Sequence, residues 1–93
     1  MDFEWDEAKS AACRGMRGFD FAYALGIFRD PERIVEADER FDYGERRLVV
    51  LGQIDGRLFV VVCTPRGGRM RLISARPANR KEISRYGDST RQS

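Results

Sequence analysis

RRLVVLGQIDGRLFVVVCTPRGGRMRLISAR, the segment from residue 46 to residue 76, contains three extended apolar stretches separated by two turn sequences. Asp55-Gly56 is typical of a two-residue hairpin turn, because both residue types accept a positive φ angle. A second turn is predicted at residues 65–68, where a proline and two glycines lie close together. The middle stretch is apolar throughout, as expected of a strand covered on both faces. The three expected strands of this antiparallel meander are residues 46–53, 58–63 and 69–76.

Upstream of the meander, the sequence pattern is mainly helical. Asp6 is expected to cap a helix over residues 7–17, which Gly18 ends. A second helix is expected over residues 21–28 after Asp20, because its apolar residues recur at intervals of three and four. Short strands are predicted at residues 3–5 and 33–37, and a polar loop at residues 38–44.

The chain after the meander ends in a third predicted helix. Pro77 suits its first turn, and Gly87 is expected to end it just after Tyr86. A meander with helices against one face is an α+β domain in two layers. The expected architecture is a central antiparallel sheet with two N-terminal helices and one C-terminal helix. The length of 93 residues fits a single domain, placed at residues 1–86, with residues 87–93 as a fraying polar tail.

The composition excludes several functional classes. The chain has no histidine, which excludes histidine-based triads, zinc hydrolases and two-histidine ribonuclease mechanisms. Cys13 and Cys63 lack the spacing of a disulfide scaffold or a metal clip, so we expect reduced, packed thiols and neither metal nor cofactor. The apolar run at residues 58–63 is far shorter than the ~20 residues that cross a bilayer. Because the acidic N-terminus lacks a secretion signal, we expect a cytoplasmic protein without membrane contact.

The net charge of +2 conceals an uneven distribution along the chain. Residues 1–45 carry twelve acids and six bases, whereas residues 46–93 carry eleven bases and three acids. This asymmetry favours a basic surface that binds a polyanion. Nearly all the bases are arginine, whose planar fork of donors matches a phosphate group. A genome rich in G and C also favours arginine, so the arginine bias alone leaves both explanations open.

The strand expected at residues 69–76 contains three arginines. Repulsion between these like charges must be relieved by acids, by solvent or by a phosphate ligand. The alternative is an edge strand whose charges protect it from aggregation. Strict alternation would place Arg69, Arg71, Ile73 and Ala75 on one face, and Met70, Leu72, Ser74 and Arg76 on the other.

The start of the final helix is a second candidate anion site, because free N–H groups and the positive end of the helix dipole favour an anion there. Arg76 and Arg80 would flank this site. Glu82 and Tyr86 lie four residues apart and therefore share a helical face. Their ordinary structural roles would be a core aromatic ring for Tyr86 and an ion pair to Arg76 or Arg85 for Glu82.

Several short segments, taken in this order, are specific to one family. They are FEWDEAK at residues 3–9, GFDF at 18–21, FRDP at 28–31, ERR at 45–47, VVVCT at 60–64, RLISAR at 71–76, and ANRKE at 78–82 with Tyr86. Together they resemble the BrnT toxins over about residues 2–86. The resemblance implies a RelE-like fold and a toxin that blocks translation by cleaving RNA. It also implies a BrnA-like ribbon-helix-helix antitoxin, in a heterotetramer that contacts operator DNA only through the antitoxin.

The chain departs from this family at one position. BrnT sequences often carry Lys-His before the glycine that ends the first helix, whereas this chain has Met16-Arg17. If that histidine takes part in RNA cleavage, this chain has reduced activity or a changed mechanism. The family's basic and tyrosine positions fall here on Arg47, Arg71, Arg76, Arg80 and Tyr86.

RNA can be cleaved without a histidine, because the ribose 2′-hydroxyl can attack the adjacent phosphorus. Arg71 and Arg76 are expected at the scissile phosphate, where one positioned donor contributes about a hundredfold in rate. Glu82 is a candidate base, and Tyr86 would need its pKa lowered from ~10 by neighbouring arginines. The expected catalytic residues are Arg47, Arg71, Arg76, Arg80, Glu82 and Tyr86, and the expected substrate-binding residues are Arg17 and Arg69.

The favoured function is a metal-independent endoribonuclease of a type II toxin–antitoxin system. Two other functions remain open. Met16-Arg17 favours a non-catalytic, toxin-like module that binds an antitoxin or RNA without cleaving it. An adaptor whose basic face meets an acidic protein would show no RNA affinity at moderate salt. Cleavage of purified RNA by the protein, and its loss in arginine variants, separates the ribonuclease from the non-catalytic module.

Overall fold

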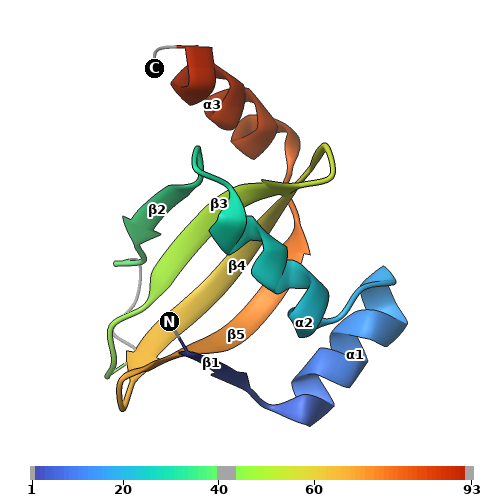
Figure 1. Ribbon diagram of the computed structural model, residues 1–93, viewed down its shortest axis with the longest axis vertical. Coiled ribbons are helices and arrows are strands. Elements are labelled where there is room, and N and C mark those ends of the chain that lie inside the picture. Colours follow the sequence, from blue (N-terminus) through green and yellow to red (C-terminus); the bar gives the residue numbers. More distant parts are fainter. Residues whose placement is uncertain (1, 40–43, 92–93) are drawn as a thin grey trace.

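The computed structural model describes residues 2–39 and 44–91, and a five-stranded sheet lies at its centre (Figure 1). The strands are β1 (Asp2–Trp5), β2 (Ile34–Ala37), β3 (Leu48–Ile54), β4 (Arg57–Arg66) and β5 (Arg69–Pro77). Their order across the sheet is β1-β5-β4-β3-β2. The predicted meander of β3, β4 and β5 is confirmed, and β2 pairs antiparallel with β3. Of the loop predicted at residues 38–44, residues 40–43 lie outside the described residues.

β1 makes the sheet mixed rather than wholly antiparallel, because it runs parallel to β5. The direction of β1 follows from what comes next in the chain. β1 leads directly into α1 (Glu7–Arg17), which packs along the second half of β5, where the Cys13 thiol donates to the Ala75 carbonyl at 3.6 Å. The predicted central sheet is therefore correct, and its antiparallel description fails for this edge strand alone.

Two tight turns set the register of the meander. Asp55 and Gly56 have φ angles of 49° and 82°, as a two-residue hairpin turn with two left-handed residues requires. Gly67 and Gly68 make the second turn in the same way, with φ angles of 58° and 78°. The turn predicted at residues 65–68 is therefore two residues shorter, and β4 continues to Arg66.

The N-terminal helices begin at side-chain caps, as predicted. The Asp6 carboxylate accepts from the N–H groups of Ala8 and Lys9, and Gly18 ends α1 in the left-handed conformation. Asp20 caps the second helix by accepting from the Tyr23 N–H. The α-helical part of this element is short. It comprises α2 (Phe21–Ala24) and continues as the 3-10 helix η1 (Leu25–Arg29) rather than as one helix over residues 21–28.

The third helix, α3 (Arg80–Arg91), differs from its prediction at both ends. Pro77 belongs to β5, and the helix begins after a capping box that Asn79 and Glu82 form. In this box, the Asn79 side chain accepts from the Glu82 N–H at 2.9 Å, and Glu82 accepts from the Asn79 N–H at 2.8 Å. Gly87 does not end the helix, because it lies within the continuous helix that runs to Arg91.

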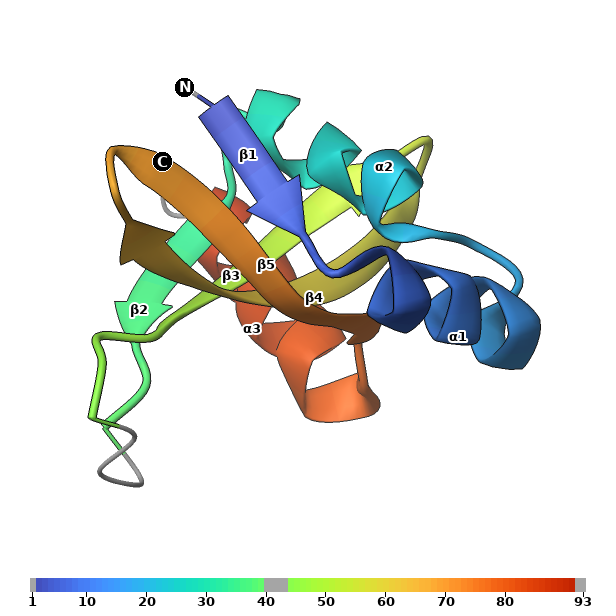
Figure 2. The same ribbon diagram turned by 90° about the horizontal axis from the view of Figure 1, so that it is seen from below.

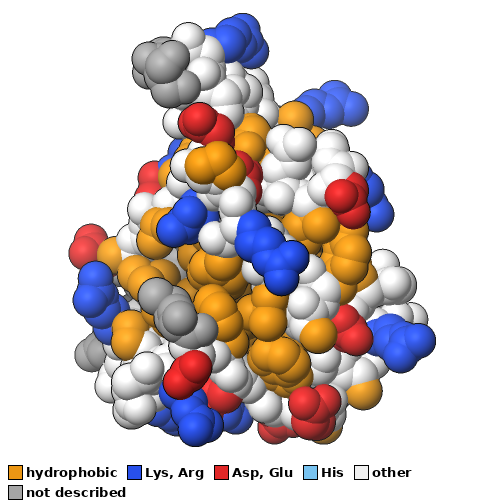
Figure 3. All heavy atoms as spheres, viewed as in Figure 1, with side chains coloured by type: hydrophobic (Ala, Val, Ile, Leu, Met, Phe, Trp, Pro, Cys, Tyr) orange, Lys and Arg blue, Asp and Glu red, His pale blue; other side chains and the backbone are white. Residues whose placement is uncertain are grey.

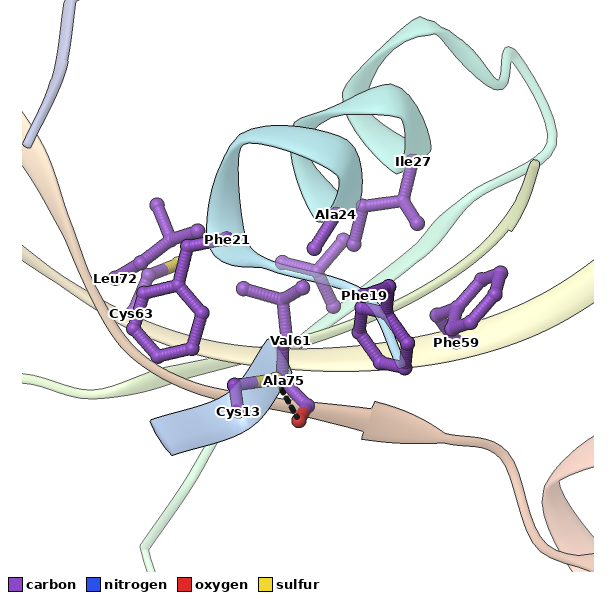
Figure 4. Packing of buried hydrophobic residues seen from close by; sticks show 11 residues of the cluster. Cys13, Phe19, Phe21, Ala24, Ile27, Phe59, Val61, Cys63, Leu72 and Ala75 are labelled. Atoms are coloured by element: carbon purple, nitrogen blue, oxygen red, sulfur yellow. Dashed lines mark hydrogen bonds between the residues drawn. The ribbon is translucent and has the colours of Figure 1, made fainter. Parts of the chain in front are cut away.

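Helices lie on both faces of the sheet, so the predicted arrangement with all helices on one face is wrong for α3. α1, α2 and η1 cover the first face, where the main core forms (Figure 4). α3 lies on the opposite face from α2 (Figure 2), and there Tyr86 packs against Leu51 and Val60. Residues of the main core include Cys13, Phe19, Phe21, Ala24, Ile27, Phe59, Val61, Cys63, Leu72 and Ala75.

Both cysteine side chains belong to the main core. Cys13 and Cys63 are free and buried, as predicted, and burial raises the pKa of the Cys63 thiol to about 11.

Hydrophobic side chains remain at the surface on the α2 side of the molecule (Figure 3). A pocket of about 700 Å³ lies there, and Phe3, Phe28 and Ile54 are part of its lining. In the described part of the chain, no helix has the length and apolar character to span a membrane.

Candidate active site

A β-bulge in β5 decides which side chains share the face that α3 only partly covers. Val62 pairs with Ser74 and Cys63 pairs with Leu72, so Ile73 is an extra residue without a partner in register. Because of this residue, Leu72 and Ala75 both point into the core on the first face. Strict alternation, which would separate these two residues, is therefore wrong for β5.

The bulge places the candidate arginines of β5 on one face. Arg71 is opposite Thr64, next to Cys63 of the main core, and therefore points to the second face. Arg76 is opposite Val60, which belongs to the smaller core on that same second face. Arg69 is two residues before Arg71 and shares its side. All three arginines thus point away from α1 and α2, onto the second face of the sheet. Because α3 covers only part of this face, we call it the half-open face.

Arg71 is held by an acid from the neighbouring strand. Glu4 is its register partner on β1, and the Arg71 Nη1 donates to the Glu4 carboxylate at 2.7 Å. The two side chains are 29% and 27% exposed, so they remain accessible to a ligand from solvent. Sequence reasoning missed Glu4, because nothing in the sequence indicates that β1 lies parallel to β5 at this register.

Arg76 is held by Glu82 from the first turn of α3. Its two terminal nitrogens donate to the two carboxylate oxygens of Glu82, each at 2.8 Å. These hydrogen bonds hold the pKa of Glu82 below its ordinary value despite partial burial. The ion pair between Glu82 and Arg76, expected as an ordinary structural role for Glu82, is thus present. This ion pair makes Glu82 a weaker proton acceptor, because the Glu82 carboxylate oxygens already accept hydrogen bonds from Arg76 and Asn79.

Tyr86 lies in an acidic rather than a basic environment. Its hydroxyl donates to the Asp30 carboxylate at 2.6 Å, and Asp30 also accepts from the N–H groups of Glu32 and Gln53. Burial, with the Asp30 hydrogen bond and negative charge, raises the pKa of Tyr86 to about 12. The condition that neighbouring arginines lower this pKa is therefore not met. The ring packs on Val60, the strand partner of Arg76, while the hydroxyl is directed to Asp30.

The remaining candidates fall into two groups. Arg47 directly precedes Leu48, which begins β3 and packs against the main core, so alternation directs the Arg47 side chain to the second face. There the Arg47 Nε lies 3.9 Å from a carboxylate oxygen of Glu45. Arg80 is the exposed first residue of α3, and in residues 2–39 and 44–91 no ion pair involves it. Arg17 is separate from these residues, because it ends α1 on the first face.

The second face also differs from a metal centre in its residues. Across the described ranges, no group of three or more His, Cys, Asp or Glu side chains is arranged to hold a metal ion. The second face instead carries several guanidinium groups. Glu4 orients that of Arg71 and Glu82 orients that of Arg76. Such groups bind and polarise a phosphate by charge-assisted hydrogen bonds.

Comparison with known proteins identifies the family. Residues 5–82 match the sequence model of BrnT, described as the ribonuclease toxin of a type II toxin–antitoxin system. A search of curated proteins finds no match. The matched range contains the bulged strand β5 and Glu82, and it stops four residues before Tyr86. The α+β fold with a central sheet is compatible with a RelE-like architecture. The chain therefore belongs to the BrnT family of ribonuclease toxins, which implies an RNA substrate and an antitoxin partner.

Proposed function

We propose that the protein cleaves RNA on the half-open face of the sheet, without a metal ion. The ribose 2′-hydroxyl attacks the adjacent phosphorus, and the bond to the 5′-oxygen of the next nucleotide breaks. The products are a 2′,3′-cyclic phosphate and a free 5′-hydroxyl. The observation that carries this proposal is the bulge at Ile73, which puts Arg71 and Arg76 on the same face.

In this proposal, Arg71 and Arg76 stabilise the negative charge that develops on the phosphorane. Arg71 donates to Glu4 with one nitrogen, which leaves further N–H donors of its guanidinium for a phosphate. Arg76 is oriented by Glu82, so Glu82 acts as a positioning residue. Arg47 and Arg80 assist from the start of β3 and the start of α3, and Arg69 contacts the neighbouring phosphate.

Tyr86 has a supporting role in this proposal. Because its pKa is raised to about 12, its hydroxyl remains protonated at neutral pH and is a donor rather than a base. It anchors α3 through Asp30 and thereby fixes the position of Glu82 one helical turn earlier. Rate enhancement would come mainly from alignment and charge stabilisation, with little proton-transfer catalysis.

A cleavage assay with purified RNA tests this function. Arg71→Gln and Arg76→Gln are each expected to reduce cleavage by about a hundredfold, since each removes one charged donor from the transition state. Arg91→Gln is the matched control, because it removes an exposed arginine at the far end of α3. Wild-type cleavage should persist in EDTA and stop when a single 2′-deoxy nucleotide replaces the scissile one. Undiminished cleavage by both variants, or products with 3′-hydroxyl ends, would refute the assignment.

The biological role follows from the same activity. RNA cleavage blocks translation and arrests growth, and a BrnA-like ribbon-helix-helix antitoxin neutralises the toxin in a heterotetramer that represses its own operon. Arg76→Ala and Arg80→Ala are expected to relieve growth arrest on expression while the protein stays folded. Co-purification with the product of an adjacent short gene, with two copies of each chain by light scattering, tests the partner.

A non-catalytic module is the second candidate function. It is favoured by one observation, namely that both candidate bases are unsuited to accept a proton. Glu82 is held by Arg76 with a lowered pKa, and Tyr86 has a raised one. This function predicts RNA or antitoxin binding by the wild-type protein with no cleavage at any pH, and the same assay distinguishes the two.

A further inference from the structure

We propose that a hollow on the first face is a second RNA-binding site, which takes one phosphate and one unpaired base of a single-stranded segment. The hollow has a volume of about 470 Å³ and lies between the end of α1, the start of α2 and the start of β4. We call it the arginine pocket. Its lining includes Arg14, Arg17, Phe19, Asp20, Tyr23 and Arg57. This inference rests on the proposed function, since it takes RNA as the substrate.

The charges around the arginine pocket are unbalanced. Arg14, Arg17 and Arg57 come from two separate segments, and all three are exposed. Among residues 2–39 and 44–91, no ion pair joins any of these three to a carboxylate. Within the part of the chain that the structure describes, the lining contains one acid, Asp20, whose carboxylate caps α2. Three cations that converge on a hollow with a single acid repel each other, and an anion relieves this repulsion.

The helix dipole explains only part of this arrangement. Arg14 and Arg17 lie in the last turn of α1, where the dipole favours cations. Arg57 begins a β-strand, so this explanation does not apply to it. Its guanidinium carbon lies 5.2 Å from the centre of the Phe59 ring. Stacking on the ring holds the guanidinium in place while its N–H edge remains available for a phosphate.

An exposed aromatic ring lies beside these cations in the arginine pocket. Tyr23 is 41% exposed, although its ring lies 6.0 Å from Phe19 and 5.8 Å from Phe59. The Phe19 and Phe59 rings lie next to each other (Figure 4), with their centres 4.9 Å apart, and the contacts of both with Tyr23 hold its ring in position. Aromatic rings combined with a basic groove are the usual means of binding single-stranded nucleic acid, because every base has a face that can stack. An acidic peptide would need the cations but not the ring.

The surface between the arginine pocket and the edge of β5 is also hollowed. Arg17 also lines a second hollow, which includes Met16, Ile73 and Ser74. β1 pairs with β5 only as far as Leu72, and among the described residues no strand lies beside the rest of β5 on that side. A strand of RNA can therefore run from the arginine pocket around this edge of β5 to Arg76 on the other face.

The experiment measures binding of a fluorescent single-stranded oligonucleotide with 2′-O-methyl groups, which cannot be cleaved. Arg17→Gln/Arg57→Gln is expected to weaken binding at least tenfold, and to reduce the slope of log affinity against log salt by about 0.7 for each phosphate that the variant no longer neutralises. Tyr23→Ala should weaken binding severalfold, and Tyr23→Phe should not. Arg33→Gln/Arg91→Gln makes the same change in net charge elsewhere and should leave binding at the wild-type level. Circular dichroism and melting curves check that each variant is folded.

A second measurement separates this site from catalysis. Arg17→Gln/Arg57→Gln should raise KM for a long RNA and leave kcat unchanged, because these residues are outside the proposed cleavage site. Wild-type affinity in this variant would overturn the arginine pocket, while loss of cleavage in Arg71→Gln would still support the proposed function. Intact RNA binding together with loss of the antitoxin complex would overturn it in favour of a protein-binding site. Absence of both RNA binding and cleavage in the wild-type protein would instead refute the proposed function.

Discussion

The Arg76 guanidinium and the Glu82 carboxylate form two parallel hydrogen bonds of 2.8 Å, and this pair joins the end of β5 to the first turn of α3. Glu82 also completes the capping box of α3 by accepting from the Asn79 N–H. One carboxylate therefore fixes both the start of the helix and the orientation of the arginine. This double use links the stability of α3 to the geometry of the proposed active site.

Glu82→Gln is predicted to lower the free energy of unfolding by about 1 to 2 kcal/mol at neutral pH. This is below the full value of a charge-assisted pair, because the Arg76 side chain is 40% exposed. The folded-state pKa of Glu82 lies below its ordinary value of 4.5, so its stabilising effect is present above that pH and disappears as the pH falls through the folded value.

Urea denaturation of both proteins over a series of pH values measures this difference. The gap between wild type and Glu82→Gln should shrink as the pH falls below 4.5. Asp88→Asn, in the exposed pair between Asp88 and Arg91, serves as the control and should change stability little. A gap of constant size at every pH would show that ionisation of Glu82 does not contribute.

Tyr86→Phe is predicted to remove a tyrosine that ionises only near pH 12. Because the pKa of Tyr86 is raised, its bond to Asp30 stabilises the fold below the ordinary value of 10 and is lost as the pH rises toward 12. Absorbance titration of the tyrosines should show this late component in the wild type and not in the variant. The variant should also lose about 1 to 2 kcal/mol at neutral pH. Ionisation of every tyrosine by pH ~10.5 would contradict the Asp30 contact, because an unperturbed tyrosine ionises near pH ~10.

Deletion of Ile73 is predicted to leave the protein cooperatively folded. Without the extra residue, Leu72 and Ala75 are two positions apart in a regular strand, so both still point into the main core. Ile73→Ala keeps the residue count, and it should remain folded with a modest loss of stability. Thermal unfolding followed by circular dichroism compares the two. Loss of the cooperative transition in the deletion protein would mean that the fold requires the bulge itself.

Gly52→Ala and Gly15→Ala are predicted to change stability in opposite directions. A Cβ at position 52 would lie 2.8 Å from the Ile27 Cβ and 3.1 Å from the Ile27 carbonyl oxygen, so β3 and η1 would have to separate. At position 15, inside α1, a Cβ would meet no described atom within 4 Å apart from those of its chain neighbours and the backbone of its own helix, and alanine should add about 0.5 to 1 kcal/mol through its higher helix propensity. Chemical denaturation measures both, and a neutral Gly52→Ala would show that the sheet and η1 can move apart freely.

Much of the fold follows from local sequence patterns. Asp6, Asp20 and Gly18 act as helix boundaries through contacts within a few residues, so their roles can be predicted from the sequence. The same is true of the Asp55-Gly56 turn, where the backbone needs two positive φ angles. The predicted end of α3 is wrong because Gly87 continues the helix where glycine usually ends one.

The arrangement of the site depends on contacts between distant segments. Arg71 and Arg76 could be identified as candidates, but their common face depends on a bulge at Ile73 that no residue type marks. The pairing of Arg71 with Glu4 depends on the parallel register of β1. Likewise, the acidic environment of Tyr86 comes from Asp30, 56 residues earlier in the chain. These features are set by tertiary structure, and the local pattern does not contain them.

The attachment of α3 determines the order in which this fold comes apart. Tyr86 is the one residue of α3 that is buried in the described helix, and Glu82 and Arg85 bind it to the sheet through polar contacts with Arg76 and Glu36. Elements with little apolar contact open locally while the rest of a protein stays native. Amide hydrogens of α3 therefore exchange with solvent long before those of β4, and each opening transiently uncovers Leu51 and Val60.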